Sequence, residues 1–177
     1  MSFRRRHQLV TTVADDIRRI LQVLRLSARR VERELGISAA QLFVLQKLVE
    51  RPAASMNELA ERTLTHQSSV SVVVRRLVAR RLVARERSAD DGRRIELRLT
   101  AAGKRLLQAA PTLPQVRAFE TLRQLEDDEL RTVARVLHLL AESVGAARLQ
   151  PQMLFADSAG VVPGRRRVPR DSEGEEG

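Results

Sequence analysis

The sequence contains no cysteine, no tryptophan and no tyrosine. Without cysteine the chain has no disulfide, no thiol nucleophile and no cysteine-based redox sensor. Its three histidines, His7, His66 and His138, lie far apart without helical ligand spacing, so we expect no metal site. No apolar run approaches the ~20 residues that a membrane span requires, and the basic N-terminal segment does not resemble a signal peptide. We therefore expect a soluble cytoplasmic protein without a metal or other cofactor.

Patterns typical of catalytic sites are also missing. The sequence shows no nucleophile placed beside a base and no glycine-rich phosphate loop. The paired acids Asp15–Asp16, Asp90–Asp91 and Asp127–Asp128 stand at expected helix starts or turns, where capping explains them. The sequence therefore predicts a protein that is not an enzyme.

What the sequence has in excess is arginine. The formal net charge is +10, and among 32 basic residues only Lys47 and Lys104 are lysines. The planar guanidinium of arginine fits phosphates and guanine edges, although a GC-rich genome enriches arginine as well. Genome composition does not explain the net charge, which favours a polyanionic partner such as nucleic acid.

Apolar spacing predicts two helices in the first 50 residues. Apolar residues at three- and four-residue intervals run from 10 to 35, which is typical of one long amphipathic helix that ends at Gly36. A second helix follows Ser38, which has the capping-box spacing with Gln41, and it ends before Pro52. The expected buried positions of this second helix are Leu42, Leu45, Leu48 and Val49.

The next two helices predict a helix-turn-helix. Ser55 and Glu58 have the same capping spacing, and a polar break then precedes residues 68–81. The run "VSVVV" has strand propensity, but residues 68–81 contain no helix breaker. Their apolar positions share one helical face: Val70, Val73, Val74 and Leu77. The opposite face carries Ser68, Ser69, Val72, Arg75 and Arg76, with Ser71 at its boundary. A polar, basic outer face on the second helix is typical of a helix-turn-helix.

An alternating segment directly after this helix predicts a β-hairpin. Apolar and charged residues alternate over 82–88 and 95–100, on either side of the turn "ADDGRR". The turn places Arg93 and Arg94 at the tip, where a wing beside a docked helix meets the minor groove of DNA. Asp91 can brace the guanidinium of Arg93. The alternative is a solvated turn whose charges have no functional role. The position of the turn directly after a helix pair disfavours this alternative.

The stretch from 57 to 107 resembles the winged-helix core of the MarR family, the multiple antibiotic resistance regulators. The resemblance rests on "ELA" in the third helix, the "S-V-x-x-x-V-x-R-L-V" pattern of the fourth, the "L-V" strand start and the "D-x-R-R…L-x-L-T-x-x-G" wing and exit. The long first helix and the helical C-terminal part fit the family layout, so the resemblance covers about 10–148.

The resemblance implies a mainly α fold with a small β-hairpin wing (α+β). The winged helix-turn-helix would span about 38–100, with dimerisation helices at about 10–35 and 101–148. Members are homodimeric transcription regulators, many of them ligand-responsive repressors, that bind pseudo-palindromic double-stranded DNA. Phenolic or aromatic small molecules bind many members between the dimer helices and the DNA-binding lobe. By position, the DNA contacts would come from Ser68, Ser69, Ser71, Val72, Arg75, Arg76, Arg93 and Arg94, with Asp91 supporting the wing.

Two positions depart from the family pattern. Arg81 stands where members usually have a glycine in left-handed conformation, and keeping that conformation costs a non-glycine residue roughly 1 kcal/mol. Val72 stands where some members place a polar base-reading side chain, and valine can only pack on a thymine methyl. The alternative function is a winged-helix module that docks an acidic protein and binds no specific DNA.

The C-terminal part predicts further helices. Thr100 is placed to cap one helix, Pro111 and Pro114 interrupt the pattern, and a last helix ends at Gly145. The last helix carries the apolar stripe Leu130, Val133, Val136, Leu137, Leu140 and Val144. With the first helix, this is more apolar surface than a small lobe covers, so we expect an interface with a second copy. The alternative is that the two helices cover each other within one chain.

The two ends and the effector site complete the expectations. Residues 1–9 are expected to form a flexible basic arm, and the Pro-, Gly- and charge-rich residues 149–177 a disordered tail. Four phenylalanines are the only aromatic residues, so an effector pocket would be mostly aliphatic and arginine-lined. Its candidate lining residues are Leu21, Arg25, Phe43 and Phe119.

Overall fold

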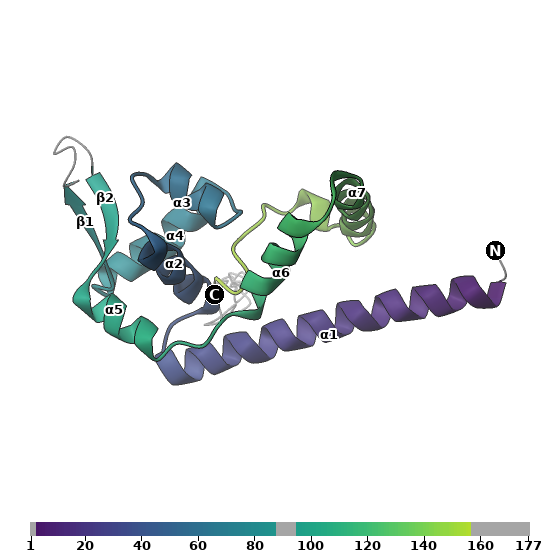
Figure 1. Cartoon of the computed structure of the whole chain (residues 1–177), viewed down its shortest axis with the longest axis horizontal. Coiled ribbons are helices and arrows are strands. Elements are labelled where there is room, and N and C mark those ends of the chain that lie inside the picture. Colours follow the sequence, from purple (N-terminus) through teal and green to yellow (C-terminus); the bar gives the residue numbers. More distant parts are fainter. Residues whose placement is uncertain (1–2, 88–94, 157–177) are drawn as a thin grey trace, which may run out of the picture.

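The computed structural model describes residues 3–87 and 95–156. This part of the chain forms seven α-helices, one two-stranded antiparallel sheet and a short 3-10 helix. Their bounds are α1 Phe3–Leu35, α2 Ala39–Glu50, α3 Met56–Arg62, α4 Gln67–Ala79, β1 Val83–Arg87, β2 Ile95–Leu99, α5 Ala101–Gln108, α6 Pro114–Gln124, α7 Asp127–Ser143 and η1 Ala146–Arg148. Figure 1 shows a lobe of α2, α3, α4 and the hairpin at one end, with α1 extending far beyond it. The predicted fold class, mainly helical with a β-hairpin wing, is confirmed.

The core of the lobe forms where α2, α3 and α4 meet. The apolar face predicted for α4 is buried as expected, since Val70, Val73, Val74 and Leu77 are at most 1% exposed. They pack with the buried side chains of the two preceding helices, including Leu42, Leu45 and Leu59. Because four of the thirteen residues of α4 point into this core, the helix can present only its opposite face to solvent.

Side-chain caps fix where the lobe helices begin. Ser38 and Gln41 form the predicted capping box, with Ser38 Oγ accepting from the Gln41 N–H at 3.2 Å and Gln41 Oε1 accepting from the Ser38 N–H at 2.9 Å. Ser55 Oγ accepts from the Glu58 N–H at 3.1 Å. The Glu58 carboxylate reaches one residue further back than a capping box requires and accepts from the Ala54 N–H at 2.8 Å. These caps satisfy N–H groups that a helix start leaves unpaired.

The hairpin pairs in a regular antiparallel register, from Val83 opposite Leu99 to Arg87 opposite Ile95. The loop between α2 and α3 forms an isolated antiparallel β-bridge with β2, which the sequence did not indicate. Ala53 donates to the Leu97 carbonyl at 3.1 Å, and Leu97 donates back to the Ala53 carbonyl at 2.8 Å. This bridge fixes the base of the wing to the helical lobe.

The apolar stripes of α1 and α7 are not covered within one chain. In α1 only Ala28 and Val31 are buried, and the stripe nearer the N-terminus is 40–56% exposed at Val13, Ile17, Ile20 and Leu21. No residue of α7 is buried, and its stripe is at least 40% exposed at Leu130, Val136, Leu137, Leu140 and Val144. The alternative that the two helices cover each other in one chain is therefore wrong for these residues.

Four expectations need correction. Asp15 and Asp16 lie inside α1 and not at a helix start or turn, and they pair with Arg18 and Arg19 at 2.6 and 2.9 Å. The flexible arm expected over residues 1–9 is helical from Phe3, because no glycine or proline interrupts the chain before Gly36 and arginine favours helix. Val49 is 58% exposed, since it lies at the solvent edge of the stripe predicted for α2. The disordered tail expected from residue 149 packs on the lobe as far as Ala156, because Met153 finds an apolar site there and is 6% exposed.

Candidate nucleic-acid interface

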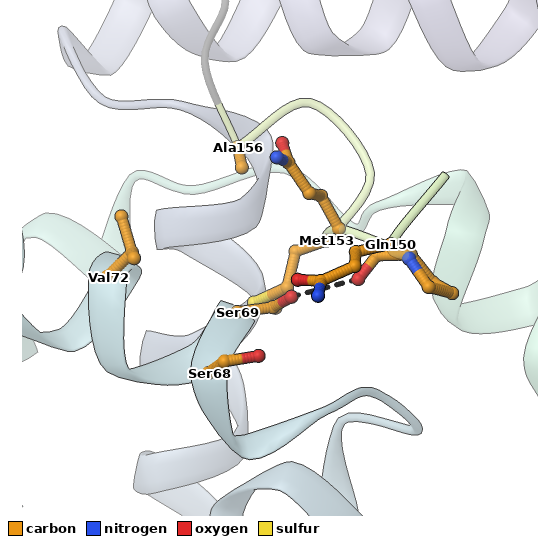
Figure 2. Close-up of a pocket in the computed structure, with 8 residues that line it drawn as sticks. Ser68, Ser69, Val72, Gln150, Met153 and Ala156 are labelled. Carbon is orange, nitrogen blue, oxygen red and sulfur yellow. Dashed lines mark hydrogen bonds between the residues drawn. The ribbon is translucent and has the colours of Figure 1, made fainter. Parts of the chain in front are cut away.

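The outward face of α4 is polar and basic, as the sequence predicted. Ser68, Val72, Arg75 and Arg76 are exposed there, while Ser69 and Ser71 are half-buried at its margins. Ser71 Oγ donates to the Gln67 carbonyl at 2.8 Å, which holds its hydroxyl against the helix backbone. All six predicted α4 residues therefore lie on a single helix and away from its apolar core face, and three of them are labelled in Figure 2.

The N-terminus of α4 leaves its first amides open. His66 is the N-cap residue, and in the described part of the chain it makes no capping hydrogen bond through its side chain. The peptide N–H groups of a first helical turn carry partial positive charge and favour an anion such as phosphate. The arrangement suits a helix whose first turn approaches a nucleic-acid backbone.

The C-terminus of α4 contains the arginine that replaces the family glycine. Arg81 has a φ of +56°, so the chain keeps the left-handed conformation despite the side chain. Thr100 Oγ1 donates to the Arg81 carbonyl at 2.8 Å, and Arg80 Nη1 donates to the Gly36 carbonyl at 2.6 Å. The end of α4 is thereby tied both to the start of α5 and to the turn after α1.

Arg62, at the end of α3, holds this helix against α2. The sequence analysis did not single out this residue. Its guanidinium donates to the carbonyls of Lys47, Arg51 and Pro52 at the end of α2, at 3.0 Å for Arg51 and 3.3 Å for Pro52. It also pairs with the Glu58 carboxylate at 3.6 Å. Burial lowers the pKa of Arg62, and the Glu58 charge opposes that shift. The residue joins the turn of the helix pair to the preceding helix.

The stem of the wing also carries exposed basic side chains. Arg85 and Arg87 lie on β1 with exposed side chains. The predicted tip residues Arg93 and Arg94 and the supporting Asp91 lie outside the described residues. The structure thus brings the six α4 residues and the wing stem into one lobe, and it leaves the tip untested.

Comparison with known proteins identifies this lobe. The profile of the MarR family matches residues 35–94, from the end of α1 through the wing. HTH-type transcriptional repressor MdtR of Bacillus subtilis is 26% identical over 136 residues, which are 77% of this chain and 88% of that protein. Residues 35–94 of this chain therefore form a winged-helix lobe that matches the MarR family. The protein is a winged-helix, DNA-binding transcriptional regulator.

Two further proteins are similar to this chain. HTH-type transcriptional repressor Rv2887 of Mycobacterium tuberculosis is 28% identical over 122 residues, which are 69% of this chain and 88% of that protein. The solved structure of the transcriptional regulator BldR from Sulfolobus solfataricus is 25% identical and superposes with a TM-score of 0.48, covering 82% of this chain and 98% of that one. The protein-docking alternative is not favoured, because the similar curated sequences are named transcriptional repressors.

The four candidate effector residues separate into two pairs. Phe43 and Phe119 meet with ring centroids 6.1 Å apart and planes tilted by 52°. They line one small pocket together with the turn after α3, Gln115 and the segment around Met153. Leu21 and Arg25 instead line a shallow depression on α1 alone. A single chain therefore does not bring the four residues into one pocket.

Neither a metal site nor a membrane-spanning helix is found in the described part of the chain. Across residues 3–87 and 95–156, no three His, Asp or Glu side chains gather in a way that could hold a metal ion. Within the same ranges no helix is both long and apolar enough to cross a membrane.

The sequence analysis did not predict that the segment after η1 contacts the candidate interface. Residues 149–156 come back to α4, where Ser69 Oγ donates to the Pro151 carbonyl at 2.9 Å (Figure 2). Arg76 Nη1 donates to the Ala156 carbonyl at 3.2 Å. The one signal for this packing was the apolar "MLF" at 153–155 inside an otherwise polar stretch, which composition alone could not place.

Proposed function

We propose that this protein is a homodimeric repressor that binds a pseudo-palindromic operator and is released by a small-molecule effector. The observation that carries the DNA-binding part is the division of α4 into a buried apolar face and an outward face of serine, valine and arginine. A repressor acts on the chromosome, so we place the protein in the cytoplasm. It has no catalytic role in this proposal.

In the complex, α4 lies in the major groove of DNA. An α-helix with its side chains is ~10–12 Å across, and the major groove of B-DNA is ~12 Å wide. Arg75 and Arg76 extend from the exposed face far enough to reach guanine edges or phosphates, and the hydroxyls of Ser68, Ser69 and Ser71 supply shorter contacts. Val72 packs on a thymine methyl and reads no hydrogen-bonding edge.

The wing supplies the second contact. We assign Arg93 to the minor groove, Arg94 to the adjacent backbone and Asp91 to bracing Arg93, on the strength of the sequence pattern. The bridge between Ala53 and Leu97 supports this assignment because it holds the base of the wing at a fixed angle to the helical lobe.

The exposed stripes of α1 and α7 support self-association. Monomeric proteins rarely expose contiguous apolar patches of this kind. Both helices are amphipathic, and their apolar sides are exposed to solvent. We assign residues 10–35 and 101–148 to the dimer interface and residues 38–100 to the DNA-binding lobe. Two copies of α4 then face successive major grooves, which fits a pseudo-palindromic site.

The aromatic pair supports an effector site beside the DNA-binding lobe. Phe43 lies on α2 inside the lobe, whereas Phe119 lies on α6 outside it, so a ligand against both rings contacts both parts of the chain. Gln115 is 3% exposed and lines the same pocket, where its amide offers a polar partner. Leu21 and Arg25 can join this site only through assembly with a second copy, because they lie on α1 away from it.

The test is fluorescence anisotropy on duplex DNA from the region upstream of the protein's own gene. A scrambled duplex of the same composition and the variant Arg93→Ala run alongside. We expect the wild type to prefer the upstream duplex, and the variant to lose affinity for it by about tenfold, which is the scale of one good contact. Equal binding of both duplexes by wild type and variant would favour the protein-docking alternative.

A further inference from the structure

The stretch after the last helix is built against the outward face of α4. Its residues 150–156 approach the helix so that two main-chain carbonyls accept from two side chains of the candidate interface. These are the Pro151 carbonyl, 2.9 Å from Ser69 Oγ, and the Ala156 carbonyl, 3.2 Å from Arg76 Nη1. Figure 2 shows the segment beside α4, with Ser68, Ser69 and Val72 facing it.

The side chain of Met153 anchors residues 150–156 in the apolar core of the lobe. Met153 is 6% exposed and belongs to the apolar core of the lobe. The Ala156 N–H donates to the Met153 carbonyl at 3.1 Å and closes a turn, in which Phe155 has a φ of +57°. Phe155 and Ala156 are half-buried against the same core. Burial of the Met153 side chain removes its apolar surface from water, and this holds the short segment against the lobe.

The covered surface overlaps the surface that DNA must reach. The segment takes the hydrogen-bonding capacity of Ser69 and lines a pocket with Ser68 and Val72, while Arg75 and Ser71 lie outside that pocket. A helix ~10–12 Å across already fills a groove ~12 Å wide, so a second layer of chain on α4 leaves no room for the groove walls. The closed arrangement and the docked helix therefore exclude each other.

We propose that residues 150–156 are an intramolecular competitor of DNA, which must leave α4 before this helix enters the major groove. The inference rests on the proposed function, because it takes the outward face of α4 as the DNA-contacting face. Its carbonyls stand in for the acceptor atoms of DNA at Ser69 and Arg76. If roughly 90% of molecules are closed, the apparent affinity for DNA is about tenfold weaker than that of the open form.

Met153 also connects the segment to the aromatic pair of Phe43 and Phe119. Met153 lines the pocket that contains Phe43 and Phe119, so the residue that anchors the segment occupies one wall of it. Any change in that pocket that expels Met153 alters coverage of α4. The segment thus connects the inner side of the lobe with the outer face of its recognition helix.

The experiment uses the full chain and three variants. Met153→Ser removes the anchor, and Ala156→Pro removes the N–H that closes the turn and changes no residue of α4. Leu149→Ser is the matched control, since Leu149 is 70% exposed and lies just before the contacts. Thermal unfolding of each variant checks that the lobe is folded, and Ala156→Pro keeps the test decisive if loss of Met153 destabilises the core.

Two readouts are measured for each variant. Anisotropy gives the Kd for the upstream duplex and for the scrambled duplex. Hydrogen exchange by mass spectrometry follows a peptide covering 149–156, with and without saturating upstream duplex. We expect Met153→Ser and Ala156→Pro to bind DNA about tenfold more tightly, Leu149→Ser to match the wild type, and wild-type exchange in this peptide to become faster on DNA.

The contrary outcomes are distinct. A wild type that prefers the upstream duplex, with variants of unchanged Kd and a segment equally protected on DNA, overturns this inference and leaves the proposed function standing. Failure of the wild type and all variants to bind either duplex at low salt overturns both.

Discussion

At the scale of single residues, Gly103 shows why the wing must be followed by a glycine. The first turn of α5 packs against the segment that follows α4, where the Thr100 N–H donates to the Leu82 carbonyl at 3.1 Å. Thr100 Oγ1 then accepts from the Gly103 N–H at 3.1 Å and caps the helix. A Cβ on residue 103 would overlap the Leu82 carbonyl oxygen, which is backbone and cannot rotate away.

Gly103→Ala is therefore expected to lower the free energy of unfolding by about 3 kcal/mol, at the upper end for overpacking. The comparison is Gly145→Ala, where no atom lies within 4 Å of the added Cβ. That variant meets only the strain of a left-handed φ of +72°, about 1 kcal/mol. Urea unfolding at matched m-values measures both. Equal losses would show that close packing at Gly103 is not what the position requires.

Several single positions were predictable because local rules decide them. The capping of α2 by Ser38 and the burial of the α4 valines follow from spacing alone. The left-handed Arg81 was predictable only through the family pattern, since nothing in its own side chain favours that conformation. Val49 was mispredicted because helical spacing places a residue at the edge of a stripe without telling which side of the edge is covered.

At the scale of elements, the lobe depends on how α3 is held against α2. Arg62 is responsible for much of this, because its guanidinium meets three carbonyls at and beyond the C-terminus of α2 and its side chain is only 11% exposed. The last carbonyls of a helix lack partners within the helix, so these hydrogen bonds satisfy acceptors that are otherwise unpaired.

Arg62→Met is expected to lower the free energy of unfolding by about 2–3 kcal/mol, because charge-assisted hydrogen bonds to partly buried carbonyls are lost while the aliphatic stem is kept. Arg51→Met is the matched control. Arg51 also pairs with Glu58, at 3.1 Å, but its side chain is 67% exposed, so we expect a loss below about 1 kcal/mol. Chemical unfolding compares the two, and a larger loss for Arg51→Met would contradict this assignment.

The order and limits of most elements followed from the sequence, whereas three features did not. The bridge between Ala53 and Leu97 joins residues far apart in the chain, and no local pattern announces it. The helix from Phe3 was missed because a run of arginines was interpreted by its charge and not by its lack of breakers. The packing of residues 149–156 depends on an apolar site for Met153 that exists only once α2, α4 and α6 are assembled.

At the scale of the whole molecule, the chain has more apolar helix surface than it covers. Figure 1 shows α1 running away from the lobe for most of its length. Its N-terminal half and the whole of α7 expose apolar side chains, including Ile20 at 56% and Leu137 at 54%. In the proposed dimer, a second copy that supplies the same two helices would cover these stripes symmetrically.

Leu137→Glu is expected to convert the proposed dimer to a monomer, because it places a charge in the centre of the α7 stripe. Arg135→Glu is the control, since Arg135 lies on the polar side of the same helix. Light scattering coupled to size-exclusion chromatography gives the mass of each variant. We expect Arg135→Glu to remain dimeric; a dimeric Leu137→Glu would place the interface elsewhere.

The central claim, that the outward face of α4 binds duplex DNA, is tested most directly by the salt dependence of the Kd. Anisotropy on the upstream duplex is repeated over a series of salt concentrations for wild type, Arg75→Ala and Arg117→Ala. Arg117 is exposed on α6, so its replacement removes the same charge at a distance from α4. We predict a steep wild-type slope of log affinity against log salt, about 0.9 per phosphate neutralised. We predict a slope reduced by about 2 in Arg75→Ala alone, because the proposed dimer loses one phosphate contact from each of its two copies. A flat wild-type slope, or equal slopes for all three proteins, would contradict the claim.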